Sequence, residues 1–414
     1  MQPILFIGIG GSGMRGLAYL LEQQGNCIIG YDDAPGLTRC TLAEATDAMH
    51  TAQYVVYTDA APKDHVLRAA ARAHKIPEYG YHEALGKFSQ RYATLAVTGT
   101  HGKSSTTAFL AHILISAGLD PTVLLGASMP SLAGKHAQLG KGAYFIVEAD
   151  EYRNHFYELH PSEIIITSID YDHPDAFSSL QDVEKSYEHF MQQLQSKGAV
   201  FVPEIEYRAH QTIAWPESTH PIPADQAADV AVLIPGAHMR TNASLAVALA
   251  EKIGVPRAQA VSSLKTFPGL GRRFEYIGDI GNTVIRSDYG HHPAEIRATL
   301  QGAREFAPET RIIAIFEAHM PQRLHAFFDD FASALAQADE VIITKPFTPA
   351  GRDEQTLRDA YRLAEAISQQ NTPAVCQFDD NELSGLLANK QPSIGILFSA
   401  GTLDERMRAI VKQS

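Results

Sequence analysis

The chain has 414 residues, a length that suggests two or three domains. Hydrophobic residues make up 45% and charged residues 20% of the chain, a balance typical of soluble globular proteins. Its net charge of −13 argues against binding to nucleic acid or to an anionic membrane, because both carry charge of the same sign. No apolar run of the sequence is long enough to span a bilayer. We therefore predict neither a nucleic-acid partner nor membrane association.

Three cysteines, Cys27, Cys40 and Cys376, have a spacing that fits neither a zinc site nor a disulfide framework. The sequence begins with a short apolar run that leads directly into a glycine turn, without the basic and long apolar regions of a signal peptide. Both features indicate a cytoplasmic protein, in which thiols stay reduced. They leave the oligomeric state open between a monomer and a homodimer.

Apolar strands alternate with helical segments in residues 1–88, which predicts a small α/β domain with a parallel sheet. The expected strands are 4–9, 27–31 and 54–57, and the expected helices are 16–23 and 65–74. A glycine turn at 10–13 lies between the first strand and the first helix.

A second α/β domain is predicted for residues 89–270. Its expected strands are 94–98, 144–148 and 163–168, and its expected helices are 106–117, 183–194 and 242–253. The strands are apolar and β-branched, as buried parallel strands are. The stretch 201–235 lacks a clear period, and we expect it to be irregular or to contain a few short strands.

A third α/β domain is predicted for residues 271–414. The expected strands lie at Ile285 and at 312–316, 340–344 and 395–399, and the expected helices are 295–306, 324–338 and 356–369. The predicted fold class is therefore α/β, with three consecutive α/β domains.

The most informative run of the sequence, Gly99-Thr-His-Gly-Lys-Ser-Ser105, is a glycine turn that follows the predicted strand 94–98 and opens a helix. Backbone N–H groups and the helix dipole favour an anion in such a turn. Lys103 can reach the terminal phosphates of a nucleotide, and Ser104 can place its hydroxyl on Mg²⁺. Only two residues separate its glycines, fewer than in the usual P-loop. We infer ATP as the ligand of this cradle, which consists of Gly99, Thr100, His101, Gly102, Lys103, Ser104 and Ser105.

The earlier glycine turn, Gly8-Ile-Gly-Gly-Ser-Gly13, also joins a strand to a helix and can hold a pyrophosphate. The first interpretation is a dinucleotide site with Asp32 on a ribose hydroxyl. Few strands precede the next cradle, however, which favours a single nucleotide diphosphate. A turn that only closes the fold is the remaining alternative.

Acidic and imidazole side chains follow two further strands. Glu148 ends the predicted strand 144–148, beside the cradle, and is a candidate Mg²⁺ ligand because Mg²⁺ prefers carboxylates with phosphate oxygens. His173, in the run Asp172-His-Pro-Asp175, is a candidate to ligate a second metal or to orient a substrate. A solvated acidic turn and a structural histidine are the respective alternatives.

Near the start of the third domain, Arg272 and Arg273 lie in a turn where they can clamp a phosphate or a carboxylate. The run Asp288-Tyr-Gly-His-His-Pro293 is unusually rich in polar chemistry for a connecting loop. A solvated basic turn and a capping aspartate are the structural alternatives.

Taken together, these runs resemble the Mur ligase family, the ATP-dependent amide-forming ligases of peptidoglycan synthesis, over nearly the whole chain. The short cradle is that family's form of the P-loop. Runs 8–16, 99–103, 148–156 and 288–295 are most similar to the branch that joins L-alanine to UDP-N-acetylmuramate. The acidic run at 148–152 and the run at 172–175 also resemble the recycling branch, which attaches a ready-made tripeptide to the same nucleotide sugar.

The resemblance implies a Rossmann-like UDP-binding domain, a P-loop ATPase-like central domain and a Rossmann-like C-terminal domain. It implies that ATP and Mg²⁺ are the cofactors and that the lactyl carboxylate forms an acyl phosphate, which the amine then attacks. Catalysis would depend on Lys103, Glu148, His173 and Arg273. Metal binding would involve Ser104, Glu148 and His173, with Lys185 where relatives carry a lysine that can be carbamylated.

The resemblance also assigns the binding residues. The nucleotide would be bound by His238, Asn242, Arg273 and Asp288 in addition to the cradle. The nucleotide-sugar substrate would be bound by Gly10, Gly11, Ser12, Gly13, Met14, Asp32, His291 or His292, and Arg323.

Two departures from the family pattern concern substrate recognition. Met239 stands where an adenine-side asparagine is usual, and the run His319-Met-Pro-Gln-Arg323 lacks one expected arginine. These departures fall in the regions that read the amino acid and the adenine, and they leave the cradle and the metal residues in place. The alternatives to L-alanine addition are the recycling reaction, a non-catalytic regulator that binds the UDP-sugar or ATP, and a dinucleotide oxidoreductase.

Overall fold

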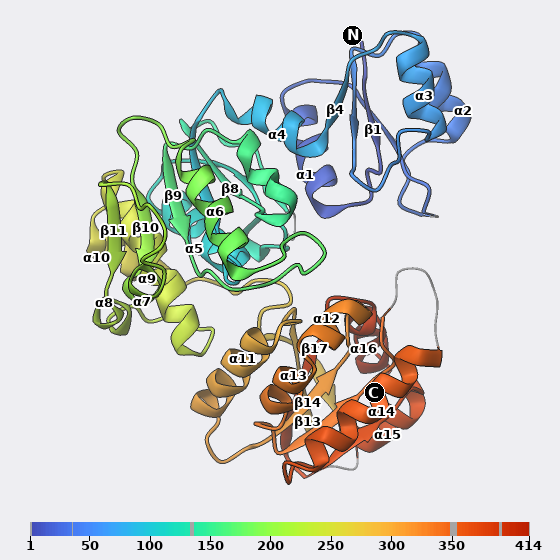
Figure 1. Cartoon of the computed structure of the whole chain (residues 1–414), viewed down its shortest axis with the longest axis vertical. Helices are drawn as coiled ribbons and strands as arrows, with labels where there is room; N and C mark the ends of the chain where they lie inside the picture. Colours follow the sequence, from blue (N-terminus) through green and yellow to red (C-terminus); the bar gives the residue numbers. More distant parts are fainter. Residues whose placement is uncertain (1, 35, 133–135, 348–353, 389–390, 414) are drawn as a thin grey trace. The chain divides into compact units, whose positions relative to one another are not determined.

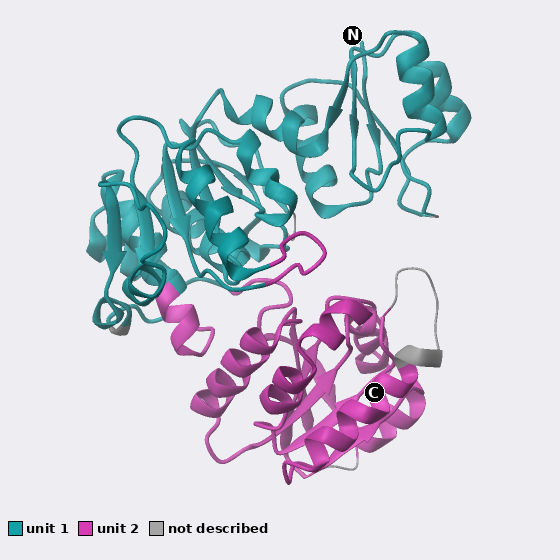
Figure 2. Cartoon of the chain, in the orientation of Figure 1, with its two compact units in different colours: residues 1–171, 179–231, 242–268 teal, residues 172–178, 232–241, 269–414 magenta. Residues whose placement is uncertain are grey.

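The computed structural model describes residues 2–34, 36–132, 136–347, 354–388 and 391–413. The chain divides into two compact units (Figure 2), residues 1–171, 179–231 and 242–268 in the first and residues 172–178, 232–241 and 269–414 in the second. Three mainly parallel sheets (Figure 1) confirm the predicted α/β fold with three consecutive domains. The boundaries at 88 and 270 remain predictions.

The first sheet has the strand order β2-β1-β3-β4, and all its strands are parallel. Its elements are β1 (Ile4–Ile7), α1 (Ser12–Gln23), β2 (Ile28–Tyr31), α2 (Leu42–Ala48), β3 (Tyr54–Tyr57), α3 (Val66–Ala73), β4 (Glu78–Gly80) and α4 (Tyr81–Ser89). Leu5, Val55 and Leu67 belong to a buried cluster beneath this sheet. The sequence patterns predicted the first three strands but not α2, β4 or α4.

Helix α1 begins four residues earlier than the predicted start at residue 16. Gly11 has extended dihedral angles and precedes the helix, so Ser12, Gly13 and Met14 form its first turn rather than part of a loop. A Cβ atom at position 13 would lie only 2.6 Å from the hydroxyl oxygen of Tyr81. Gly13 and Gly16, which both lie within α1, masked the helical signal because glycine is a poor helix former.

The second sheet, also in the first unit, has the order β11-β10-β9-β5-β8-β6-β7, and only the β6–β7 pair is antiparallel. Its strands are β5 (Ala93–Thr98), β6 (Thr122–Leu124), β7 (Ala137–Gln138), β8 (Tyr144–Glu148), β9 (Glu163–Ile166), β10 (Val200–Pro203) and β11 (Thr219–Ile222). The helical segments are α5 (Lys103–Ser116), η1 (Pro130–Leu132), η2 (Tyr152–Glu158), α6 (Leu180–Met191), α7 (Glu204–Ala209), α8 (Ala224–Ala228), α9 (Ala237–Lys252) and α10 (Arg257–Leu264).

The stretch 201–235 is more regular than predicted. It holds most of β10, all of β11 and the short helices α7 and α8. The prediction of short strands was right, but the helices were missed because six and five residues are too few to show a helical period.

The third sheet lies in the second unit, with the order β12-β13-β17-β14-β15-β16 and one antiparallel pair, β12–β13. Its strands are β12 (Glu275–Ile280), β13 (Thr283–Asp288), β14 (Arg311–Phe316), β15 (Glu340–Ile343), β16 (Ala374–Cys376) and β17 (Ser393–Phe398). The helices are α11 (Pro293–Phe306), α12 (Pro321–Ala326), α13 (Phe328–Leu335), α14 (Glu354–Ser368), α15 (Asp380–Ala388) and α16 (Leu403–Val411).

The predicted single helix 324–338 was wrong, because the structure has two helices that meet at Phe327. The dihedral angles of Phe327, φ −121° and ψ 30°, are not helical. Pro321 also starts the first of these helices earlier than predicted, at the position where a proline best fits a helix.

Among the described residues, no helix combines the length and the apolar character that crossing a bilayer requires.

Candidate active site

The cradle between β5 and α5 depends on two glycines in the left-handed region, Gly99 with φ +133° and Gly102 with φ +88°. A Cβ atom at position 99 would overlap with the hydroxyl oxygen of Thr167, just after β9. A Cβ atom at position 102 would lie 2.8 Å from the side-chain amide of Asn242. Because both positions lack room for a side chain and favour glycine conformations, the backbone itself forms the floor of the cradle.

Hydrogen bonds hold the rest of the cradle to the segment after β9. The backbone N–H of His101 donates to Ser168 Oγ at 2.9 Å, and Thr100 Oγ1 donates to the carbonyl of Asp170 at 3.1 Å. The N–H of Asp170 donates back to Thr100 Oγ1 at 2.9 Å. Helix α5 starts directly afterwards at Lys103, so its first N–H groups and its dipole face the turn, as an anion site requires.

Lys103 is held by the carboxylate of Glu151, for which no sequence pattern indicated a role. Its Nζ donates to both oxygens of Glu151, at 2.8 and 3.1 Å, and to the carbonyl of Gly99 at 2.6 Å. Burial alone would lower the pKa of Lys103, but the carboxylates of Glu151, Asp150 and Glu148 together raise it above its ordinary value. The lysine therefore stays charged, as a phosphate-binding group must.

Glu151 is 1% exposed. Burial raises the pKa of its carboxyl group to about 7, against the opposing effect of Lys103. The run Glu148-Ala-Asp-Glu contains this residue, but nothing in the spacing showed which of its three carboxylates turns toward the lysine.

Glu148 ends β8 beside β5, where it pairs with Val97. Its Oε2 accepts a hydrogen bond from the N–H of Gly126. Its Oε1 is buried and has no hydrogen-bond partner among the residues that the structure describes. A buried carboxylate oxygen with spare acceptor capacity, in the same unit as the Ser104 hydroxyl, fits the oxygen chemistry of Mg²⁺.

The other two predicted metal ligands are placed differently. Lys185 lies on the exposed face of α6. His173 belongs to the second unit, has a left-handed backbone with φ 55°, and follows Asp172, whose Oδ1 accepts its N–H at 2.7 Å. Their roles toward a metal remain predictions.

The N-terminal glycine turn is organised by Asp32. Oδ2 of this residue accepts the N–H of Gly10 at 2.7 Å, and Oδ1 accepts the N–H of Ala34 at 2.9 Å. The carboxylate thus shapes the turn, while Gly11 precedes α1, Ser12 and Gly13 begin the helix, and Met14 is buried. The turn combines close backbone approach with a helix start, the two features that favour a diphosphate.

In the second unit, Arg323 forms a buried bidentate ion pair with Asp172. Its Nη2 donates to both carboxylate oxygens at 3.0 and 3.1 Å, and both side chains are 6% exposed. Burial alone would raise the pKa of Asp172, but Arg323 and His173 lower it to about 2. Removing one partner of such a pair costs about 3–5 kcal/mol. The predicted substrate role of Arg323 would therefore compete with a strong internal contact that the sequence did not reveal.

Asp288 is buried at the end of β13. It accepts the N–H of Phe274 at 3.0 Å and that of Gly290 at 2.8 Å. Burial raises the pKa of this carboxyl group to about 6, although Arg273 opposes the shift.

The guanidinium of Arg273 lies 5.3 Å from the centre of the Tyr289 ring, and its Nε has no hydrogen-bond partner among the described residues. Burial and the charge of Arg273 lower the pKa of His238 to about 4. The structure therefore brings Arg273, Asp288 and His238 into one electrostatic group within the second unit. Asn242, by contrast, belongs to the first unit, where it packs against Gly102.

The two adjacent histidines after β13 have different local roles. His292 caps α11, because its Nδ1 accepts the N–H of Ala294 at 3.3 Å. His291 contacts the carbonyl of Tyr289 through Nδ1 at 3.0 Å, and burial lowers its pKa to about 4. A neutral His291 is available for hydrogen bonding to a substrate, whereas His292 already stabilises a helix start.

Comparison with known families identifies three consecutive matches. Residues 3–93 match the model of the Mur ligase family, catalytic domain; residues 97–220 match the Mur ligase middle domain; and residues 272–399 match the Mur ligase, glutamate ligase domain.

Comparison with individual proteins agrees with these three family matches. The chain is 33% identical over 407 residues to a UDP-N-acetylmuramate–L-alanine ligase of Desulfitobacterium hafniense, covering 90% of each chain. It is 31% identical to the ligase of the same name from a Synechococcus species, covering 100% of this chain and 93% of the relative.

Among solved structures, the UDP-N-acetylmuramate-alanine ligase MurC of Thermotoga maritima matches with a TM-score of 0.80 at 23% identity, covering 100% of this chain and 99% of that one. The murein peptide ligase mpl of Psychrobacter arcticus matches with a TM-score of 0.69 at 22% identity, covering 100% and 98% of the two chains. At these identities, the structural likeness shows a shared fold.

Asp288 gives the stability of the chain a specific pH dependence. Because the folded-state pKa of about 6 lies above that of an unfolded aspartate, the folded chain binds the proton more tightly. This stabilisation is fully present below about pH 4 and is lost as the pH rises through about 6, with an upper limit of about 3 kcal/mol. Asp288→Asn cannot lose a proton, so its free energy of unfolding should lack this component.

Urea unfolding of the wild type and Asp288→Asn between pH 4 and 7 tests the difference. The wild type should lose stability relative to the variant across this interval. A difference in unfolding free energy that stays constant with pH would contradict the assignment.

Proposed function

The chain belongs to the Mur ligase family, and we propose that it forms the amide bond between the lactyl carboxylate of UDP-N-acetylmuramate and L-alanine at the expense of ATP. It is accordingly an ATP-dependent ligase of peptidoglycan synthesis. The support for this substrate pair is the identity of over 30%, along nearly the full chain, to relatives that carry this activity in their names.

The observation that carries the proposal is the cradle. A nucleoside triphosphate requires backbone donors for its phosphates, a positive charge and a ligand for its metal ion. The cradle provides a turn without side chains at Gly99 and Gly102 and a helix that starts at Lys103. Glu148 adds a carboxylate with an unused buried oxygen. The backbone N–H groups of the turn would bind the phosphates.

Lys103 would exchange Glu151 for the β- and γ-phosphates when the nucleotide binds. Phosphate oxygens would then replace a carboxylate as the acceptors of the ammonium group. Glu151, with a pKa of about 7 even while paired, can take up a proton after the lysine leaves, so the exchange does not leave an isolated buried charge.

The reaction follows two steps. A carboxylate oxygen of the substrate attacks the γ-phosphorus, and the bond to the β-phosphate oxygen breaks, which gives an acyl phosphate and ADP. The uncharged amine of L-alanine then attacks the acyl carbon, the phosphate leaves with that carboxylate oxygen, and the amine loses a proton. Lys103 would stabilise the negative charge of the transferred phosphoryl group, which is the main task of a protein in such transfers.

Mg²⁺ would neutralise phosphate charge in this reaction. Ser104 and Glu148 are the residues that we propose to hold it, and His173 and Lys185 are further candidates that rest on the family resemblance alone.

The remaining assignments also rest on that resemblance. We propose that His238, Asn242, Arg273 and Asp288 act on the ATP nucleotide, that Gly10 to Met14 and Asp32 act on the UDP moiety, and that His291 acts on the muramyl group. We prefer His291 to His292 for the last role because His292 caps α11. Arg323 is the weakest of the substrate candidates, because its guanidinium is already paired with Asp172.

A second candidate reaction is the attachment of a murein tripeptide to the same nucleotide sugar. Two observations favour keeping it: the fold shared with a murein peptide ligase and the unusual run His319-Met-Pro-Gln-Arg323. With ATP and UDP-N-acetylmuramate present, L-alanine and the tripeptide can compete for the enzyme, and mass spectrometry of the products identifies the preferred amine. We expect the L-alanyl product; predominance of the tripeptide product would reverse the order of the two candidates.

Lys103→Ala should abolish turnover, with a loss of at least about a thousandfold in kcat, because both phosphate charge stabilisation and positioning are removed. Phosphate release from ATP in the presence of both other substrates measures the effect. Lys141→Ala is the matched control, since this lysine is an exposed residue of the same unit, and it should keep wild-type activity. Calorimetry should show that Lys103→Ala still binds UDP-N-acetylmuramate. Normal turnover by Lys103→Ala would exclude the cradle as the ATP site.

Glu148→Gln should raise the Mg²⁺ concentration needed for half-maximal activity by about tenfold or more, because an amide oxygen is a weaker ligand than a carboxylate. Activity titrated with MgCl₂ at saturating ATP measures this shift. Glu217→Gln, at an exposed position of the same unit, should leave the titration unchanged. An unaltered Mg²⁺ requirement in Glu148→Gln would remove this residue from the metal site.

A further inference from the structure

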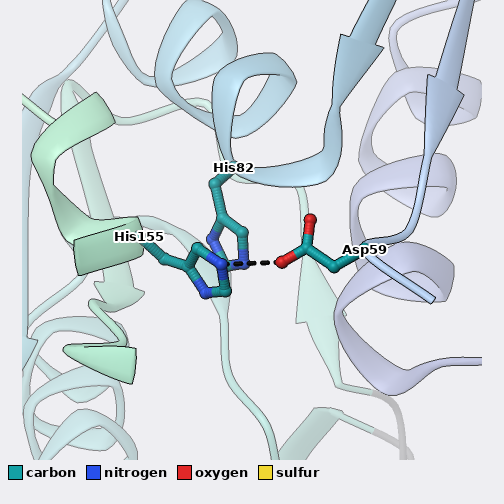
Figure 3. A group of neighbouring side chains, drawn as sticks. All are labelled: Asp59, His82 and His155. Atoms are coloured by element: carbon teal, nitrogen blue, oxygen red, sulfur yellow. Dashed lines mark ion pairs between the residues drawn. The ribbon is translucent and has the colours of Figure 1, made fainter. Parts of the chain in front are cut away.

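Three potential metal ligands come together in the first unit from separate elements (Figure 3). Asp59 follows β3, His82 is the second residue of α4, and His155 lies in η2. One ligand atom from each residue lies within 4.8 Å of the other two. No local sequence pattern indicates this group, because 23 and 73 residues separate its members along the chain.

His155 has a carboxylate on each side of its ring. Its Nε2 lies 2.7 Å from Asp59 Oδ2, and its Nδ1 lies 3.8 Å from Asp150 Oδ2. A histidine that ligates a metal through one nitrogen commonly has its other nitrogen directed toward a carboxylate, which fixes the ring and increases its basicity. Asp150 lies on that second side of the ring, although its 3.8 Å separation from Nδ1 is longer than a hydrogen bond.

His82 lies against the same ring. The two imidazoles are stacked, with centroids 3.7 Å apart and planes inclined by 14°. A simple ion pair between His155 and Asp59 would account for one histidine but not for a second imidazole beside the same carboxylate. Two imidazoles and one carboxylate are instead a common donor set for divalent transition metals.

The backbone around His155 is closely constrained. Arg153 and Asn154, directly before it, both have left-handed dihedral angles. The N–H of Asn154 donates to the carbonyl of Glu151 at 2.9 Å, and its Oδ1 accepts the hydroxyl of Ser186 at 2.6 Å. On the other side, the buried ring of Phe156 stacks on Phe190 with centroids 4.3 Å apart. The chain therefore presents His155 at a fixed position.

We propose that Asp59, His82 and His155 form a binding site for a divalent transition metal of the Zn²⁺ class, separate from the Mg²⁺ residues of the cradle. Imidazole nitrogens favour Zn²⁺, Co²⁺ or Cu²⁺ over Mg²⁺, which prefers oxygen donors in an octahedral arrangement. Binding requires the His82 ring to tilt out of the stack, because parallel rings cannot direct their lone pairs to one point. Asp59 is exposed, so a metal from solution can reach the site.

Three protein ligands leave a coordination position of the metal for water or for an anionic oxygen ligand. The neighbours of Asp59 and His82 contact the N-terminal glycine turn. Thr58, beside Asp59, packs over Gly8, and Tyr81, beside His82, packs over Gly13. The proposed site therefore adjoins both ends of the N-terminal glycine turn, and phosphate is the class of anion that we expect the bound metal to accept.

The test uses the full-length protein after removal of metals with a chelator. Isothermal titration with ZnCl₂ in excess Mg²⁺ should show about one equivalent of tight binding per chain, and Cu²⁺ electron paramagnetic resonance should show coupling to two nitrogens. His82→Gln and His155→Gln should each weaken Zn²⁺ binding by at least about tenfold, and the resonance signal should lose one nitrogen coupling. Asp59→Asn, at an exposed position, provides a third ligand variant with little risk to folding.

Two control variants make the result specific. His50 and His74 form an edge-to-face ring pair in the same unit, with centroids 4.7 Å apart, so His50→Ala tests for adventitious binding by surface histidines and should leave Zn²⁺ affinity unchanged. Glu148→Gln removes the proposed Mg²⁺ ligand and should also leave it unchanged. Thermal melts without metal establish that each variant is folded.

The proposal would be overturned by equal Zn²⁺ affinity in the wild type, His155→Gln and Asp59→Asn, or by loss of binding in Glu148→Gln with retention in the three ligand variants. It would equally be overturned if the wild type bound no Zn²⁺ at micromolar concentration. None of these outcomes bears on the ligase activity, which is measured separately.

Discussion

The cradle depends on one steric constraint, the contact between the backbone at Gly99 and the side chain of Thr167. Strand β5 and the segment after β9 approach so closely at this point that no Cβ atom fits. The chain turns with positive φ at residues 99 and 102, and Lys103 follows as the first residue of α5. The close contact with Thr167 thus explains the glycine at position 99, and the side chain of Asn242 excludes a Cβ atom at position 102.

Around this turn, the charges are arranged in advance of any ligand. Glu148 ends β8, the strand next to β5, and Asp150 and Glu151 follow it, so parallel pairing brings three carboxylates to the edge where the cradle opens. They keep Lys103 charged, and one of them has a pKa near neutrality. A phosphate that displaces Glu151 from the lysine therefore meets a site that can adjust its own charge by one proton.

The sequence predicted those parts of the fold that have a strong period or a glycine turn: the central strands, the cradle and the three-domain α/β organisation. It failed where signals were short or masked, as in α7 and α8 or in the start of α1 within a glycine-rich run. Side-chain pairing was least accessible. The contacts of Arg323 with Asp172 and of His155 with Asp59 join residues 151 and 96 positions apart, and no local pattern encodes them.

The central claim is that the cradle activates a substrate carboxylate as an acyl phosphate. It is tested most directly with UDP-N-acetylmuramate labelled with ¹⁸O in its lactyl carboxylate, incubated with ATP, Mg²⁺ and L-alanine. Mass spectrometry of the released inorganic phosphate should find one ¹⁸O atom per amide bond formed, because the phosphate leaves with an oxygen of the carboxylate. Phosphate without the label, or release of AMP and pyrophosphate in place of ADP and phosphate, would contradict the account.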